Sequence, residues 1–476
     1  MLQDGDAAYP GSLAAIGFED GRIAVVNTLS GGTLFSMSSE RPIVYRSKNN
    51  NNNNNNSANN HYSIDDVVFT LDNRAVIGRS GTSVTIWVLP EGKERRRIPS
   101  QEATSMAHCG RHPEGNGDFI LIGNARGYVS MWHVPLSLTN HTEDIHEQAM
   151  DVALISESYQ GENIAITCTA CSLDGSRCLS GNASGTLVLW SSVRGSLEKH
   201  AVLKTQWGLG APVTSCCFRP DGQRVAACSS ECPTVHVWDV HGAPSSVIWS
   251  GCGTGKGQGV ESVKWSGDGR AIVTLSSSGT GVWIWDSESG SRLALMEGSH
   301  QSVRCLGFVY IPIGPDTVMC SMFTGGNDRI LRFWNFSGIV PGAPGRRIFE
   351  KEDLDSVGRK VHSHGRIINK FDVIRAAQQQ GEKDNTVGAV TLENAAKARL
   401  EELRAESAKR RSTALSGHEG GSVTCSSKCG PNMIVTGGVD GILRIWALPE
   451  GKHIASLSGT GGGIGVVRHL LCFVVG

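Results

Sequence analysis

The stretch VWIWDSESG, residues 282–290, decides the fold because variants of it recur along the chain. A cluster of tryptophan, aspartate and small polar residues could form a ligand site or a packing element, and repetition favours packing. Close copies are VHVWDVHG (235–242), LVLWSSVRG (187–195), LRFWNFSG (331–338) and LRIWALPEG (443–451). Looser copies are VTIWVLPEG (84–92), VSMWHVP (129–135) and RIAVVNTLSGG (22–32), and the last lacks the tryptophan.

The tryptophans of these copies mark a period, with most intervals 45 to 49 residues. They are Trp87, Trp132, Trp190, Trp238, Trp285, Trp334 and Trp446. Within each unit, alternating apolar segments are joined by turns such as SLDGS (172–176), RPDGQ (219–223) and SGDGR (266–270). Alternation bounded by Asp-Gly turns predicts antiparallel hairpins. Hairpins repeating at this period predict the blades of a β-propeller, which bury their faces by stacking in a ring.

At the level of these motifs the chain resembles the WD-repeat family of β-propellers. The resemblance implies a structural His–Thr–Asp–Trp tetrad inside a blade, where the buried indole N–H needs an acceptor. Two such sets match the family pattern: His300, Thr324, Asp328 and Trp334, and His418, Thr436, Asp440 and Trp446. Other units depart at the aspartate, where they have Ser184, Cys232, Gly279, Arg126 and Gly81, while Asp20 keeps it in the first unit.

The predicted fold is all-β, a WD-repeat β-propeller of eight blades, or alternatively seven, with a helical insert. The first unit lacks one strand, and GVVRHLLCFVVG near the end echoes the opening strand QSVRCLGFVYI (301–311). We therefore expect residues 465–473 to pair with the first blade and close the ring, which leaves no exposed sheet edge there. The expected organisation is an incomplete first blade (1–38), an Asn-rich disordered loop (39–60), blades two to seven (61–337), a partly helical insert (338–412), and the last blade with the closing strand (413–476).

The insert is the strongest candidate for a docking element. Its segments GRIINKFDVIRAAQQQG (365–381) and TLENAAKARLEELRAESAKRR (391–411) have apolar residues at helical spacing and are rich in helix formers. The alternatives are a solvated extension and, because residues 341–415 carry 15 Lys/Arg against 11 Asp/Glu, a nucleic-acid contact. The candidate partner-binding residues are Ile367, Phe371, Ile374, Leu400, Leu403 and, on a separate loop, Trp207, which alternatively caps a strand.

Motifs for catalysis, cofactors or metals fail in detail. The loop SGCGTGKGQG (250–259) lacks the first glycine and the Ser/Thr of a phosphate-binding loop, and Cys168 and Cys171 point to opposite faces of a strand. No secretory signal or membrane span is visible, so the 14 cysteines are expected to be reduced, in the cytoplasm or nucleus. The net charge of -1 gives no reason to expect nucleic acid as the main partner.

These features predict a non-enzymatic interaction scaffold without cofactor or small-molecule substrate. Proteins or peptides would bind on the propeller faces and through residues 341–415. A narrower alternative is a subunit of a nuclear-pore or membrane-traffic complex. It comes from residues 213–240 and 260–270, which are similar to the propeller of the nucleoporin aladin. It also comes from the insert, whose placement is similar to that in the propeller of the class III phosphatidylinositol kinase regulatory subunit. A third reading is an enzyme that uses the propeller as its scaffold.

Overall fold

The computed structural model describes the β-strands and most of their tight connections. The described residues are 13–27, 33–38, 63–70, 75–81, 83–89, 93–98, 102–111, 117–135, 152–161, 163–203, 205, 207, 210–241, 247–252, 259–277, 281–290, 292–296, 303–314, 317–335, 413–416, 418, 421–428, 433–448, 451–458 and 463–469. The predicted helices at 365–381 and 391–411 and the Asn-rich loop lie outside these residues.

All regular elements of the described residues are β-strands, and they form eight four-stranded sheets. The first sixteen are β1 (Leu13–Phe18), β2 (Arg22–Asn27), β3 (Thr33–Ser38), β4 (Ile64–Phe69), β5 (Ala75–Ser80), β6 (Ser83–Val88), β7 (Lys93–Ile98), β8 (Ala103–Arg111), β9 (Gly117–Asn124), β10 (Tyr128–Pro135), β11 (Ala153–Tyr159), β12 (Ile166–Cys171), β13 (Arg177–Asn182), β14 (Leu187–Val193), β15 (Ser196–Leu203) and β16 (Ser215–Phe218). The others are β17 (Arg224–Ser229), β18 (Cys232–Asp239), β19 (Val247–Cys252), β20 (Val260–Trp265), β21 (Ala271–Ser276), β22 (Val282–Asp286), β23 (Arg292–Met296), β24 (Val303–Gly314), β25 (Thr317–Gly326), β26 (Ile330–Asn335), β27 (Thr413–Ser416), β28 (Val423–Lys428), β29 (Met433–Gly438), β30 (Ile442–Ala447), β31 (Lys452–Ser458) and β32 (Ile464–His469).

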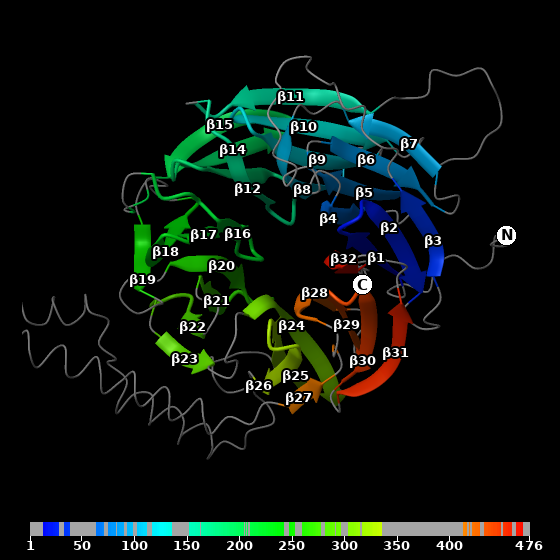
Figure 1. The fold of residues 1–476 in the computed structure, drawn as a ribbon. Coiled ribbons are helices and arrows are strands. Elements are labelled where there is room, and N and C mark those ends of the chain that lie inside the picture. The colour runs from blue at the N-terminus through cyan, green and yellow to red at the C-terminus, as the bar shows by residue number, and fades with distance from the viewer. Residues whose placement is uncertain are drawn as a thin grey trace, which may run out of the picture.

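The sheets are the blades of an eight-bladed β-propeller (Figure 1). From the inner strand outward, blade one is β32-β1-β2-β3, blade two is β4 to β7, blade three β8 to β11, blade four β12 to β15, blade five β16 to β19, blade six β20 to β23, blade seven β24 to β27 and blade eight β28 to β31. Figure 1 shows the inner strands around a common centre and strands such as β3, β19 and β31 on the rim. The prediction of eight blades is confirmed, and the divergent third unit is a full blade.

Blade one is completed from the other end of the chain. β32 pairs antiparallel with β1, with Ala14 opposite His469 and Phe18 opposite Ile464. The amide of Glu19 also donates to the carbonyl of Gly463 at 3.0 Å. The predicted closure by the C-terminal strand is thereby confirmed, and the ring has no open inner edge at this junction.

The outer strand of blade seven comes from beyond the insert. β27 pairs with β26, with Ile330 opposite Ser416 and Phe333 opposite Thr413. Residues 413–416 therefore belong to blade seven, which corrects their expected grouping with the last blade. The insert lies between the third and fourth strands of one blade rather than between two blades. The grouping was wrong because each repeat in the sequence begins with the outer strand of the preceding blade, so the repeat boundary is not the blade boundary.

The tryptophan markers lie on the third strand of their blades and fill the packing between blades. Trp87, Trp190, Trp238 and Trp285 are at most 1% exposed. The pairing of the third and fourth strands shifts register immediately before the tryptophan in each of these blades, as between Ile284 and Trp285. Such a bulge increases the local twist and re-aims the side chain. The predicted Asp-Gly turns also form, with Gly175, Gly222 and Gly269 at φ of 69°, 71° and 69°.

Candidate functional site

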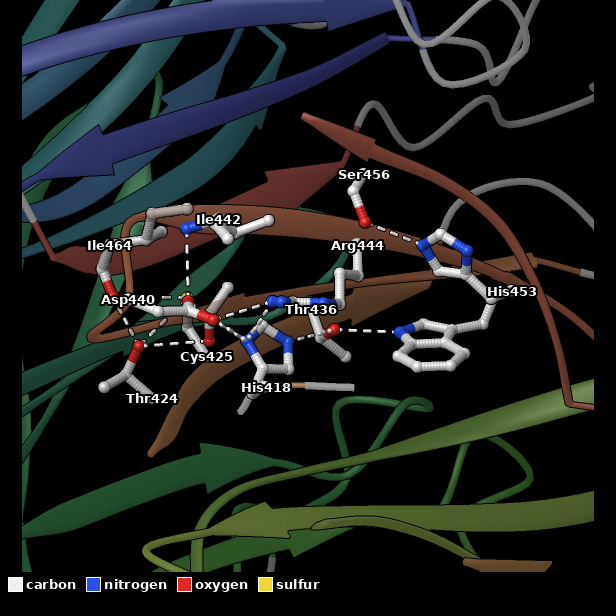
Figure 2. Close-up of polar contacts among 12 residues, drawn as sticks. His418, Thr424, Cys425, Thr436, Asp440, Ile442, Arg444, His453, Ser456 and Ile464 are labelled. Atoms are coloured by element: carbon white, nitrogen blue, oxygen red, sulfur yellow. Dashed lines mark hydrogen bonds and ion pairs between the residues drawn. The ribbon is translucent and has the colours of Figure 1, made fainter. Parts of the chain in front are cut away.

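The most complete polar network of the described residues lies inside blade eight (Figure 2). The indole N–H of Trp446 donates to Thr436 Oγ1 at 2.9 Å, and Thr436 Oγ1 lies 3.0 Å from His418 Nε2. On the other side of the ring, His418 Nδ1 lies 3.2 Å from Asp440 Oδ1. We assign the tautomer with the proton on Nδ1, because it lets each group in the chain find a complementary partner. The structure thus brings together all four residues of the second tetrad.

A buried arginine extends this network beyond four residues. Arg444 Nη1 donates to Asp440 Oδ2 at 2.8 Å and lies 2.7 Å from His418 Nδ1, and Figure 2 shows the three side chains converging. Because Nδ1 carries a proton, the contact between Arg444 and His418 is not a hydrogen bond, and both side chains instead donate to the Asp440 carboxylate. Burial opposes ionisation of Asp440, but hydrogen bonds from Arg444, from the Ile442 amide and from His418 hold the pKa of Asp440 below its ordinary value. Burial and the charge of Arg444 lower the pKa of His418. The network therefore contains a neutral histidine beside an ion pair at neutral pH.

This network has the chemistry of a packing element. The side chains of His418 and Asp440 are 1% and 5% exposed, so a substrate cannot reach them. Every polar atom named above also has a partner inside the blade, and buried polar groups are stable only under that condition. The tetrad therefore holds the loop that carries His418 against β29 and β30.

The first tetrad is described only in part. Thr324 is buried, and Asp328 accepts from the Ile330 amide and pairs with Arg332, as Asp440 does with Arg444. His300 and the side chain of Trp334 lie outside the described residues.

Three of the blades that lack the aspartate still give their tryptophan a hydroxyl acceptor. In blade four, Trp190 donates to Ser180 at 2.7 Å, and Ser180 donates to Gln160 Oε1 at 2.5 Å. In blade six, Trp285 donates to Thr274 at 3.0 Å. In blade three, Trp132 donates to Ser130 at 2.9 Å. A hydroxyl is thus the common acceptor of these blades, and the histidine and aspartate are replaceable.

In blade five, three aromatic rings in tilted contact take the place of the polar network, and Trp207 is one of them. The rings of Trp207 and His236 are 5.2 Å apart, and those of His236 and Trp238 are 5.6 Å apart. Opposite His236 stands Ala227, where blade eight has Thr436. Within the described residues, the indole N–H groups of Trp207 and Trp238 have no hydrogen-bond partner. Trp207 is 9% exposed, so in this structure it packs between blades four and five and is not a surface contact.

The buried His236 predicts a loss of stability in acid. Burial lowers the pKa of His236 from 6.5 to about 4, so the unfolded state binds more protons than the folded state between these pH values. Its contribution is intact above pH about 6.5, and we expect about 2–3 kcal/mol to be lost on going from pH 7 to pH 4.5. Urea unfolding of wild type and His236→Leu at both pH values measures this. Equal losses in the two proteins would contradict the assignment.

The sequence analysis missed a second set of interblade bonds, made by threonines on the inner strands. Each threonine hydroxyl hydrogen-bonds to a main-chain carbonyl of the next blade. In blades three and eight the threonine lies at a β-bulge, where it has no partner residue on the neighbouring strand. The pairs are Thr104 with Ile166, Thr167 with Val213, Thr214 with Val260 and Thr424 with Ile464. A bulge redirects a side chain, which explains the reach. The signal in the sequence was a threonine directly after the first apolar residue of these strands.

The expectation that all cysteines are reduced is wrong for one pair. Cys109 and Cys171 form a disulfide between blades three and four, so not all cysteines are reduced. Their sequence separation of 62 gave no sign of the pair, because β8 and β12 meet only when the two blades stack. Cys168 and Cys171 do point to opposite faces: Cys168 lies 3.7 Å from the Val213 carbonyl of the blade five side, and Cys171 lies toward blade three.

The remaining candidate contact residues cannot be placed. Ile367, Phe371, Ile374, Leu400 and Leu403 fall outside the described residues. In the part of the chain that the structure describes, no helix is long and apolar enough to cross a membrane.

Two segments of the chain are similar to a known repeat family. The family model described as "WD domain, G-beta repeat" matches residues 201–239 and 409–447. The chain is an eight-bladed β-propeller, and these two segments are similar to WD40 repeats. No curated protein matches it. Among solved structures, the computationally designed Ika8 protein is 15% identical, with a TM-score of 0.56 over 93% of this chain and 95% of that chain. The C-terminal WD40 domain of Sif2 is 15% identical, with a TM-score of 0.46 over 75% of this chain and 73% of that one.

The matched WD40 segments are offset from the blades. Residues 409–447 include β27 of blade seven and then β28, β29 and β30 of blade eight. Residues 201–239 likewise begin in β15 of blade four and continue through the three inner strands of blade five. Both matched segments therefore span a blade boundary, which ties the neighbouring blades together through the chain itself.

Proposed function

We propose that this propeller is a non-enzymatic scaffold for protein–protein interaction, with the ring as the platform and residues 336–412 as its docking arm. Propellers of this kind present rigid faces and a rim to peptides and proteins. The internal networks of the described blades are buried, and their polar groups are used in packing between strands. These buried groups therefore act in packing, and the proposal places partner binding on the faces and the rim of the ring.

The main support for a docking arm is the way residues 336–412 are attached to blade seven. β26 and β27 are adjacent antiparallel strands, so both ends of residues 336–412 are held together at the rim of blade seven. In an antiparallel blade, the connection from third to fourth strand leaves from the same face as the turn from first to second strand. The Asn-rich segment joins β3 to β4 and therefore leaves from the opposite face.

The arm also has the composition of a contact element. Residues 341–415 carry a local charge of +4, from 15 basic and 11 acidic residues, in a chain of net charge -1. An amphipathic pattern with a positive excess fits a partner surface that is apolar and slightly acidic. The narrower assignment to a nuclear-pore or membrane-traffic complex stays a prediction from sequence similarity.

The test is a paired affinity purification in which residues 341–408 are replaced by a short Gly/Ser linker. Ending the replacement at 408 spares β27, whose loss would expose the edge of β26. The matched control replaces residues 43–60, on the opposite face, with the same linker. We expect the first variant to lose a partner that the control and the wild type retain. Identical partner sets in all three proteins would show that the arm does not dock partners.

A further inference from the structure

Three cysteine sulfurs meet where blade three packs against blade four. Cys109 lies on β8, and Cys171 and Cys178 are directly opposite each other on β12 and β13. The disulfide joins Cys109 to Cys171. The third sulfur, of Cys178, lies 3.6 Å from that of Cys171 and 3.9 Å from that of Cys109.

Backbone packing brings the two blades this close. The turn between β12 and β13 places Gly175 against the β8 backbone, where an added Cβ would lie 2.1 Å from the carbonyl oxygen of Cys109. Gly175 also has a φ of 69°, which favours glycine. A glycine in this Asp-Gly turn thus permits the close approach that brings the three sulfurs together.

Two of the three cysteines are buried, and Cys171 is half-buried. Cys109 and Cys178 are 1% and 0% exposed, within the apolar core that contains Phe119, Trp190 and Leu197. Among the described residues these cysteines are also the one group of metal-ligating side chains whose atoms all lie within 4.8 Å of one another. The disulfide occupies two of the three sulfurs, so sulfur exchange fits the arrangement better than metal binding.

We propose that Cys109, Cys171 and Cys178 form a thiol–disulfide exchange centre that moves one bond between two positions. The Cys178 thiolate attacks the sulfur of Cys171, the Cys171–Cys178 bond forms, and the Cys109–Cys171 bond breaks. The electron pair leaves on the sulfur of Cys109, which takes up a proton in place of the one that Cys178 lost. The step needs no oxidant or reductant. It converts a bond between blades into a bond within blade four and so releases blade three.

The buried surroundings of Cys178 should make the thiol–disulfide exchange slow. Burial, with the nearby charge of Asp174, raises the pKa of Cys178 to about 12, so its thiol is protonated at neutral pH while the blades are packed. The thiolate is the nucleophile, and exchange therefore follows opening of the interface. We expect it over hours rather than seconds, within the known range for such rearrangements.

The experiment maps disulfides in the full-length chain without reductant. Samples held at pH 8 are quenched in acid, free thiols are alkylated in denaturant, and linked peptides are identified by mass spectrometry. The Cys109–Cys171 link should dominate at the start. The Cys171–Cys178 link should then grow in step with alkylation of Cys109. Cys178→Ser should retain only the first link throughout, and Cys168→Ser, altered on the opposite face of the same strand, should behave as wild type.

The melting temperature tests whether the Cys109–Cys171 disulfide stabilises the contact between blades three and four. Closing a loop of 62 residues in a chain of this size should raise the melting temperature by about 4 °C, so Cys109→Ser should melt about that much below Cys178→Ser. The proposal is overturned if wild type keeps only the Cys109–Cys171 link over a day. It is also overturned if all three thiols are free after purification, or if unfolding releases a stoichiometric metal ion.

Discussion

Deletion of residues 463–476 is expected to abolish cooperative folding of the ring. The deleted strand β32 completes blade one and packs against blades eight and two, so its loss opens the edge of β1. Its residue Ile464 also accepts a hydrogen bond from Thr424 of blade eight. Circular dichroism melting and size-exclusion chromatography measure the result. An unchanged melting temperature would disprove the closing role of β32.

A point substitution gives a graded form of the same prediction. Ile464 is 1% exposed and packs on Gly437 of blade eight, so Ile464→Ala should lower the free energy of unfolding by about 2–4 kcal/mol. The matched control is Ile454→Ala on the outer strand β31, where the side chain is 44% exposed and the change should be within about 0.5 kcal/mol. Similar losses at both positions in urea unfolding would mean that closure contributes little.

Replacement of Asp440 by alanine should be the most destabilising single change in the polar networks. It leaves Arg444 as a buried charge without its carboxylate and removes a partner of His418. Breaking a buried pair from one side costs about 3–5 kcal/mol, because the remaining charge is desolvated and uncompensated. Guanidinium unfolding of Asp440→Ala measures the loss.

The first blade offers the control. Asp20 has the equivalent place in its unit and pairs with Arg22, but the two side chains are 34% and 24% exposed. Asp20→Ala should therefore cost at most about 1 kcal/mol. Equal costs for Asp20→Ala and Asp440→Ala would show that the buried network of blade eight is no stronger than a surface pair.

The fold was predictable because the repeat contains its physical causes. Alternating apolar residues specify strands, the Asp-Gly turns supply residues with positive φ, and each tryptophan marks the third strand of a blade. The closing strand was predictable as well, since its sequence echoes the first strand of other units. The outer strand β27 was not predictable, because it has only four residues and the insert separates it from β26 in the sequence.

The internal contacts of the site were only partly predictable. The four residues His418, Thr436, Asp440 and Trp446 could be aligned to a motif, but Arg444 could not, because its role depends on reaching across β30 into the same buried space. Trp207 was proposed as a surface contact. It is buried because the loop that carries it folds onto His236, a contact that no local pattern indicates.

By itself the sequence determined the class of fold, because period and alternation are local properties of the chain. It also predicted eight blades, with seven as the alternative, and the strand that closes the ring. Only the tertiary structure decided to which blade residues 413–416 belong and which threonines bond to the neighbouring blade. It also decided that Cys109 lies beside Cys171 and Cys178. Each of these depends on residues tens of positions apart that come together only when the blades stack, and the repeat does not show which side chains make contact across that boundary.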